Sequence, residues 1–259
     1  MVKNSGFTPF YLEPRNKNYQ FIRPGFIYSR NGDSNTAIDK NSDPILIEEL
    51  WRKRLGINKP AIERFGELLD NKDNWKYVFN LYHHIYEPSF TIETLDEDND
   101  NEMFYSYVMT NERTRFETLV VRYNNVPINS CQIVNLDSGR YTTVTPDWYF
   151  FKFHNNGVRE VFEYKYFIKE TLEYKLHKFL LDDNEEALYA YRRFMKVIVV
   201  FESHNELNDF NNYLLDKENE FRQRLNVKLE KKSRLHAQDK RRIEIGKLVN
   251  EMLNEFRIK

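Results

Sequence analysis

The chain has 259 residues, of which 39 are lysine or arginine and 40 are aspartate or glutamate, so its formal net charge is −1. This balance excludes a protein that is basic over its whole surface, although it leaves room for a local basic patch. The single cysteine excludes an internal disulfide framework and a cysteine-cluster zinc site. The longest purely apolar run, Val197 to Phe201, is far shorter than the ~20 residues that cross a bilayer. We therefore expect a cytoplasmic protein that does not enter a membrane.

Residues 1–74 read as short strands followed by two helices. The aromatic runs Phe7–Leu12 and Phe26–Tyr28 favour strands. Asp43 and Pro44 are typical of a helix start and Gly56 of a helix end, which predicts a helix over Pro44–Leu55 and a second helix that begins near Pro60. Trp51 lies on the apolar stripe of the first helix, so we expect it to be buried between the two.

Residues 75–166 are typical of an antiparallel β region. Asp137-Ser138-Gly139 and Asn155-Asn156-Gly157 separate aromatic and β-branched runs and predict hairpin turns. The expected strands are Phe90–Leu95, Met103–Met109, Phe116–Tyr123, Ile128–Leu136, Tyr141–Val144 and Trp148–Phe153.

Residues 167–259 read as mostly helical, because from Phe167 the apolar period shifts toward 3.6 residues. Helices are expected from about Ile168 to Leu180, over Glu185–Arg193 and through Leu207–Leu214, with one buried strand at Val197–Phe201. The last forty or so residues are charged and helical. The fold class predicted for the whole chain is α+β, with N-terminal strands and two helices, a central antiparallel sheet, and a helical C-terminal part around one inserted strand.

One stretch near the N-terminus resembles a known family. Gly25, Tyr28, Arg30, Gly32 and Thr36 follow a G-x-x-Y-x-R-x-G-x-x-x-T pattern, and Leu50-Trp51-Arg52-Lys53-Arg54 lies on the helix that follows. This is similar to the C-terminal end of the AlbA-type (Schlafen-like) DNA-binding domain and the segment that follows it in a bacterial subgroup. The resemblance covers about the first fifty residues, and it is fainter around Gly139-Arg140-Tyr141 and Leu172–Lys175.

The resemblance implies a DNA-binding, regulatory module. The acidic strand that opens the family's domain, and that serves RNA cleavage in vertebrate Schlafens, has no counterpart before Phe7. No nuclease activity is therefore implied, and we expect the chain to be part of a larger or split protein, with a separate N-terminal half-domain as one partner.

Two basic segments are candidates for contact with nucleic acid. Arg23 and Arg30 flank a strand that ends in a polar loop, Asn31 to Thr36, and this loop with the two arginines could hold phosphate oxygens. Between Arg222 and Arg242 there are nine basic residues and two acidic ones, whereas Asp182–Glu220 carries ten acidic residues and four basic ones. The candidate DNA- or RNA-binding residues are Arg23, Arg30, Lys231, Lys232, Arg234, Lys240, Arg241 and Arg242.

A different interpretation applies to the same residues. The arginines can pair with nearby carboxylates, and the C-terminal helices can pack on the body of the protein or associate with a second copy. This reading makes the chain a structural protein-interaction domain.

A second alternative is a Mg²⁺-dependent nuclease. Pro146-Asp147 precedes Glu163-Tyr164-Lys165 by sixteen positions, as in the PD-(D/E)xK pattern, in which two carboxylates hold the metal beside a lysine. Asp147 is also a simple turn residue after Pro146.

The histidines show no metal-ligand spacing, so we expect no metal or other cofactor. The function that we predict is a non-catalytic, nucleic-acid-associated module.

Overall fold

The computed structural model describes residues 23, 25–31, 34–37, 40–56, 59–79, 81–96, 108, 114–155, 158–231 and 235–258. The chain divides into two compact units, Met1–Arg64 and Phe65–Lys259. The expected strands at Phe7–Leu12 and Met103–Met109 lie outside the described residues, apart from Val108. The α+β class predicted from the sequence is confirmed.

The first unit contains a short antiparallel pair, β1 (Arg30–Asn31) and β2 (Ser34–Asn35), followed by α1 (Pro44–Leu55). The Asp43 carboxylate accepts a hydrogen bond from the Ile45 N–H at 2.8 Å, and Gly56 ends the helix with φ 63°. Both helix signals in the sequence therefore act as predicted.

The predicted burial of Trp51 is wrong. No residue of α1 is buried, and the partly exposed Trp51 indole has the Arg54 guanidinium 5.3 Å from its ring centroid. Arg54 projects from the same side of α1 as Ile47 and Trp51 and interrupts the apolar stripe, so the helix lacks the continuous apolar face that burial requires.

The helix α2 (Ala61–Leu68) crosses the border between the units and is followed by a short 3-10 helix, η2 (Lys72–Asn74). A six-stranded antiparallel meander comes next, with its strands paired in chain order. The strands are β3 (Trp75–Val78), β4 (Leu81–His84), β5 (Phe90–Asp96), β6 (Arg115–Tyr123), β7 (Val126–Leu136) and β8 (Tyr141–Val144).

A second sheet holds the strands β9 (Asp147–Asn155), β10 (Val158–Ile168) and β11 (Ile198–Phe201). The strand β10 is central, antiparallel to β9 and parallel to β11. The expectation of a single central sheet is therefore corrected, because β9 and β10 pair with the strand from the helical part and not with β8. The predicted boundary at residue 166 falls within β10.

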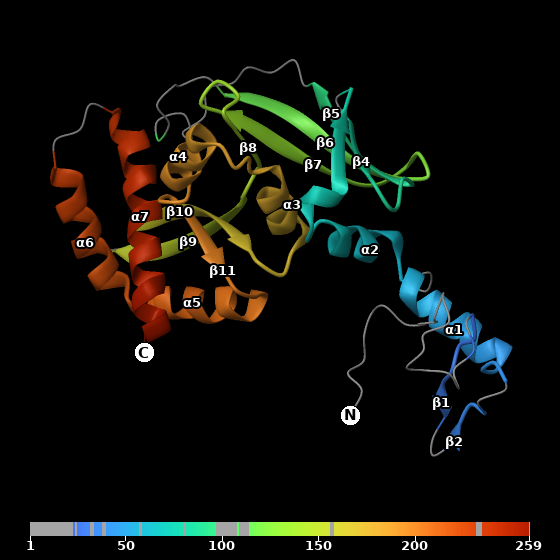
Figure 1. Cartoon of the computed structure of the whole chain (residues 1–259). Coiled ribbons are helices and arrows are strands. Elements are labelled where there is room, and N and C mark those ends of the chain that lie inside the picture. The colour runs from blue at the N-terminus through green and yellow to red at the C-terminus, as the bar shows by residue number, and fades with distance from the viewer. Residues whose placement is uncertain are drawn as a thin grey trace. The chain divides into compact units, whose positions relative to one another are not determined.

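Five helices complete the second unit: α3 (Leu172–Leu180), α4 (Glu185–Phe194), α5 (His204–Asp216), α6 (Glu218–Glu230) and α7 (Ala237–Ile258). The helices α3 and α4 connect β10 to β11, and α6 lies alongside α7 (Figure 1). Phe167 and Ile168, which the sequence placed at a helix start, are instead the end of β10.

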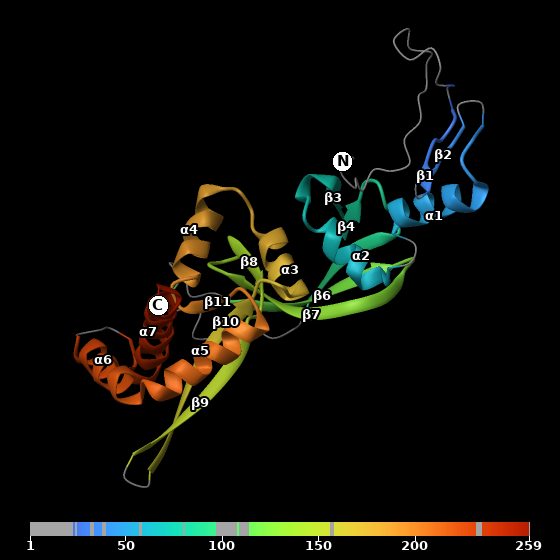
Figure 2. The same cartoon turned by 90° about the horizontal axis from the view of Figure 1, so that it is seen from below.

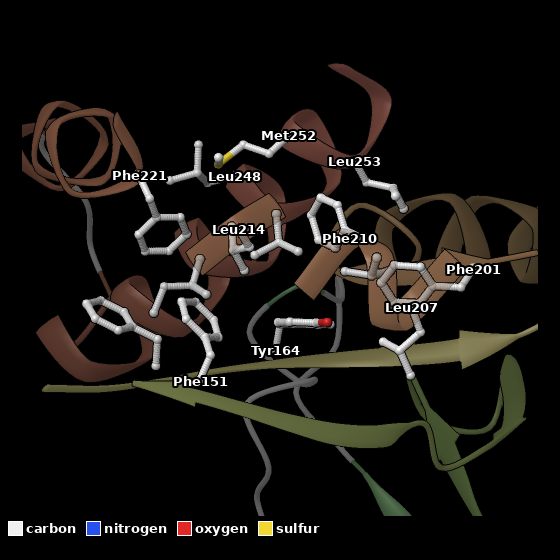
Figure 3. Packing of buried hydrophobic residues seen from close by; sticks show 14 of the residues in the cluster. Phe151, Tyr164, Phe201, Leu207, Phe210, Leu214, Phe221, Leu248, Met252 and Leu253 are labelled. Carbon is white, nitrogen blue, oxygen red and sulfur yellow. The ribbon is translucent and has the colours of Figure 1, made fainter. Parts of the chain in front are cut away.

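The main core lies between the second sheet and the last three helices. Every second residue of β9 and of β10 points into this core, for example Phe151 and Tyr164. These side chains face Phe210 of α5, Phe221 of α6 and Leu248 of α7 (Figure 3). Near the centre, the Tyr164 hydroxyl donates to Asn211 Oδ1 at 2.7 Å, which satisfies the hydroxyl group in this apolar setting.

Helix α7 approaches β11 very closely at Gly246. A Cβ atom added there would lie 2.5 Å from the Val197 carbonyl oxygen, which is closer than atoms can pack. A glycine in a helix interior normally costs about 1 kcal/mol relative to alanine. The glycine is required here because the backbones of two elements meet.

We expect Gly246→Ala to lower the free energy of unfolding by roughly 1–3 kcal/mol, because the added methyl group forces α7 away from Val197. Gly66→Ala is the matched control, since its Cβ would meet only Leu172 Cδ1, at 3.8 Å. That change should be neutral or stabilise α2 by ~0.5–1 kcal/mol. Urea unfolding of both variants measures the difference, and equal effects would contradict the packing argument.

A buried histidine joins the two sheets. His177 of α3 is fully buried, with Nδ1 2.7 Å from Thr143 Oγ1 of β8 and its ring stacked on Phe167 of β10 at 4.6 Å. No described residue forms a hydrogen bond with its Nε2. Burial, aided by the nearby Lys178 charge, lowers the pKa of His177 to about 3.

The folded state therefore keeps His177 neutral at pH values where the unfolded chain, with a histidine pKa near ~6.5, binds a proton. The stability that depends on the neutral form is lost as the pH falls from about 6.5 toward about 3. Between pH 6.5 and pH 4.5, the free energy of unfolding of the parent should fall by on the order of 2 kcal/mol more than that of His177→Phe, because the variant has no group to protonate at this position. Urea unfolding at several pH values tests this. The control is His236→Gln at an exposed position, and its free energy of unfolding should vary with pH as that of the parent does.

Candidate nucleic-acid interface

A basic pocket of about 840 Å³ lies between α4, α6 and α7 of the second unit and is called here the α4–α6–α7 pocket. Its described lining includes one carboxylate, that of Glu244, and an apolar floor with Val197 and Ile243. The cations around it are Arg192, Arg193, Lys196, Lys228, Lys231, Lys240 and Lys247.

Helix ends bring these cations together. Arg192 and Arg193 lie in the last turn of α4, and Lys228 lies in the last turn of α6. Positive side chains are favoured at these ends because the backbone carbonyls there carry partial negative charge. The buried Ile243 sets the rotation of α7, so that Lys240 and Lys247, one turn to either side, line the pocket.

Most of these charges are not neutralised by carboxylates. Lys228 pairs with Glu251 at 2.7 Å, and Lys247 pairs with Glu244 at 2.8 Å. Within the described part of the chain, five others form no ion pair: Arg192, Arg193, Lys196, Lys231 and Lys240.

Backbone carbonyls and one tyrosine hold several of the five in place. Arg192 Nε donates to the Leu188 carbonyl at 3.1 Å, and Arg193 donates to the Val108 carbonyl and to the Tyr189 hydroxyl. Lys240 donates to the Lys231 carbonyl. These contacts fix the side chains without cancelling their charge, so the pocket can attract an anion.

The structure separates the predicted C-terminal residues into two groups. Lys231 and Lys240 line the α4–α6–α7 pocket, whereas Arg241 and Arg242 bind carboxylates of β10. Lys232 and Arg234 lie outside the described residues. The predicted segment therefore contains residues in two different environments, because a helix turns about 100° at each residue and neighbouring side chains point in different directions.

Arg241 and Arg242 hold α7 against the sheet. Arg241 and Arg222 both bind Glu160, and Arg242 Nε donates to Glu163 Oε1 at 2.8 Å. Burial raises the pKa of Glu160, but the hydrogen bonds and charges of Arg241 and Arg222 outweigh this effect and lower it below its usual value. The interpretation in which arginines pair with local carboxylates describes these residues.

In the first unit, Arg23 is exposed, with its guanidinium 5.6 Å from the Phe26 ring centroid. Nothing is described of the Arg30 side chain. The two ends of the predicted phosphate loop are joined to each other, because the Thr36 N–H donates to the Ser29 carbonyl at 2.9 Å and the Ser29 N–H donates to Thr36 Oγ1 at 3.0 Å. These two backbone donors are therefore already used and cannot hold a phosphate.

The residues of the nuclease pattern lie on opposite faces of the second sheet. Asp147 pairs with Tyr166 across the β9–β10 ladder, and Glu163 pairs with Phe150. Asp147 and Phe150 are three positions apart on one strand, so their side chains point to opposite faces. Burial and the charge of Glu173 raise the pKa of Asp147, while Glu163 is bound to Arg242.

Lys165 shares a face with Glu163 but is almost completely buried. Its Nζ lies 3.5 Å from the Trp148 ring centroid, and burial lowers the pKa of its ammonium to about 7 against the opposing charge of Glu163. No group of three or more potential metal ligands occurs among the residues that the structure describes. The pattern therefore does not assemble into a two-carboxylate centre here.

The binding residues predicted from the sequence omit five cations of the pocket, which are Arg192, Arg193, Lys196, Lys228 and Lys247. Arg192, Arg193 and Lys196 were counted as a minority within an acidic segment. The signal that could have found them is local, since three cations within five positions at a helix end form a cluster regardless of the acidic residues elsewhere in the segment.

Comparison with known proteins adds no assignment, because no protein-family model, curated protein or solved structure matches this chain. Throughout the described ranges, every helix is too short or too polar to span a bilayer.

The ion pairs of Arg241 predict a structural role that can be separated from binding. We expect Arg241→Ala to lower the free energy of unfolding by about 1 kcal/mol, a modest value because both partners are partly exposed to solvent. Arg192→Ala should change it by less than about 0.5 kcal/mol, since the exposed Arg192 has no carboxylate partner in the described structure. Urea unfolding compares the two, and a larger loss for Arg192→Ala would contradict this division.

Proposed function

We propose that this chain is a nucleic-acid-binding module without catalytic activity of its own, and that it contacts the phosphate backbone through the α4–α6–α7 pocket. The observation that carries the proposal is the group of five cations around one pocket that no described carboxylate neutralises. A polyanion supplies the missing negative charge and releases its own counterions when it binds.

The overall charge of the chain restricts the interaction to this local surface. At a net charge of −1, the rest of the molecule does not attract a polyanion at long range. Binding in the non-specific range, with Kd about 10⁻⁴–10⁻⁶ M at physiological salt, is therefore expected. Residues 25–54, which belong to the first unit, resemble an AlbA-type DNA-binding domain. This resemblance also supports nucleic acid as the class of ligand.

The test is charge reversal in the pocket. The double variant Arg192→Glu/Lys196→Glu should weaken binding of a labelled 20-base-pair duplex at least tenfold at low salt. It should also make the slope of log K against log salt shallower by about 1.8, because each duplex phosphate neutralised contributes about 0.9. Fluorescence polarisation at several salt concentrations measures both quantities.

Lys76→Glu/Lys178→Glu is the matched control, because it changes the net charge by the same amount at exposed positions outside the pocket. Its effect should be within about threefold of the parent. Absence of binding at low salt, binding indifferent to salt, or equal losses in the two double variants would overturn the proposal.

A further inference from the structure

The β9–β10 hairpin presents aromatic side chains on the face that points away from the main core. Phe151 and Phe153 of β9 are buried, whereas Trp148 and Phe150, which alternate with them, are 39% and 54% exposed. Val161 of β10 lies on the same face and is 50% exposed. Figure 2 shows that the hairpin extends past α5 and α6.

Trp148 and Phe150 form a pair of nearly parallel, partly exposed rings, called here the aromatic platform. Their ring centroids are 5.9 Å apart, and their planes differ by only 6°. The buried Lys165 ammonium, 3.5 Å from the Trp148 ring centroid, attracts the negative face of the indole and fixes its orientation. A ligand therefore meets rings that are already in place.

Positive charges flank the platform. The exposed Lys152 follows Phe150 at the next same-facing position of β9, and the exposed Arg159 lies on the same face of β10. Glu163 is the carboxylate on this face, and it is paired with Arg242. A partly exposed pair of aromatic rings with cations beside it matches a ligand that combines aromatic rings with negative charge.

The aromatic platform and the α4–α6–α7 pocket both belong to the second unit. The buried Val197 contributes to the pocket and also to a small cavity bounded by Trp148, Lys165 and Arg242. The two sites therefore lie on either side of one buried residue.

We propose that the ligand is single-stranded nucleic acid, whose unpaired bases stack on Trp148 and Phe150. This inference rests on the proposed function and adds the form of the nucleic acid. Bases in a duplex are stacked on one another and paired, so aromatic side chains can reach only unpaired bases, and such stacking tolerates every base.

The experiment compares a labelled 20-nucleotide oligo-dT with a dA·dT duplex of 20 base pairs by polarisation at one salt concentration. Phe150→Ala should weaken oligo-dT binding roughly 5- to 150-fold, the range that loss of one stacked base produces, and should leave duplex binding within about twofold. Phe79→Ala is the matched control, because Phe79 is a 97% exposed aromatic residue in the turn that follows β3, away from the β9–β10 hairpin. It should leave both affinities unchanged.

Trp148 supplies an independent signal. The chain has three tryptophans, and base stacking should quench the emission of Trp148 when oligo-dT is added. Trp148→Phe keeps an aromatic plane, so it should retain affinity within about fivefold of the parent while abolishing the quenching. Quenching that persists in this variant, or that is absent in the parent, would overturn the inference.

The outcomes separate this inference from the proposed function. If Arg192→Glu/Lys196→Glu abolishes binding while Phe150→Ala leaves oligo-dT affinity unchanged, the platform inference is wrong and the phosphate pocket stands. If the parent binds neither probe at low salt, both are wrong. If Phe150→Ala instead removes concentration-dependent self-association in sedimentation and leaves oligo-dT binding intact, the platform is a protein interface and the inference is also overturned.

Discussion

Helix α7 can lie against β11 only because residue 246 has no side chain. The 2.5 Å between the Val197 carbonyl oxygen and the position that a Cβ would occupy leaves no room for any other residue. This contact sets both the depth and the rotation of α7. Leu248 and Met252 then enter the aromatic core, and the charged residues of its first turns are distributed around the helix in fixed directions.

That rotation decides the role of each basic residue on the helix. Arg241 and Arg242 reach the carboxylates of β10, while Lys240 and Lys247 reach the space between α4 and α6. One side of α7 therefore uses its charges for docking on the sheet, and another side leaves charge available to a ligand. A segment that looks uniformly basic in sequence therefore places its charges in two different environments in the fold.

The β9–β10 hairpin divides its side chains in a comparable way. The face with Phe151 and Tyr164 forms the core with the last three helices, and the opposite face carries Trp148 and Phe150 at the surface. The same alternation separates Asp147 from Glu163 and Lys165, which explains why a spacing typical of a nuclease does not produce a metal centre here. The hairpin therefore contributes one face to core packing and the other to the aromatic platform.

Local patterns were sufficient to predict many elements of this protein. Asp43, Pro44 and Gly56 mark the ends of α1, Asp137-Ser138-Gly139 forms the turn before β8, and the apolar run at Val197–Phe201 contains β11. These signals act through backbone conformation and capping within a few residues, so the sequence by itself determines them. The basic character of residues 222–242 was equally visible.

Tertiary structure alone decided which strands pair and where each charge points. The pairing of β10 with β11 joins residues about thirty positions apart, and no local pattern encodes that choice. The sequence showed Arg192 and Lys196 within an acidic segment and Arg241 within a basic one, yet the first two line the pocket and the third is paired with Glu160. Charge neutralisation depends on distances between elements, and those distances exist only after the helices have packed.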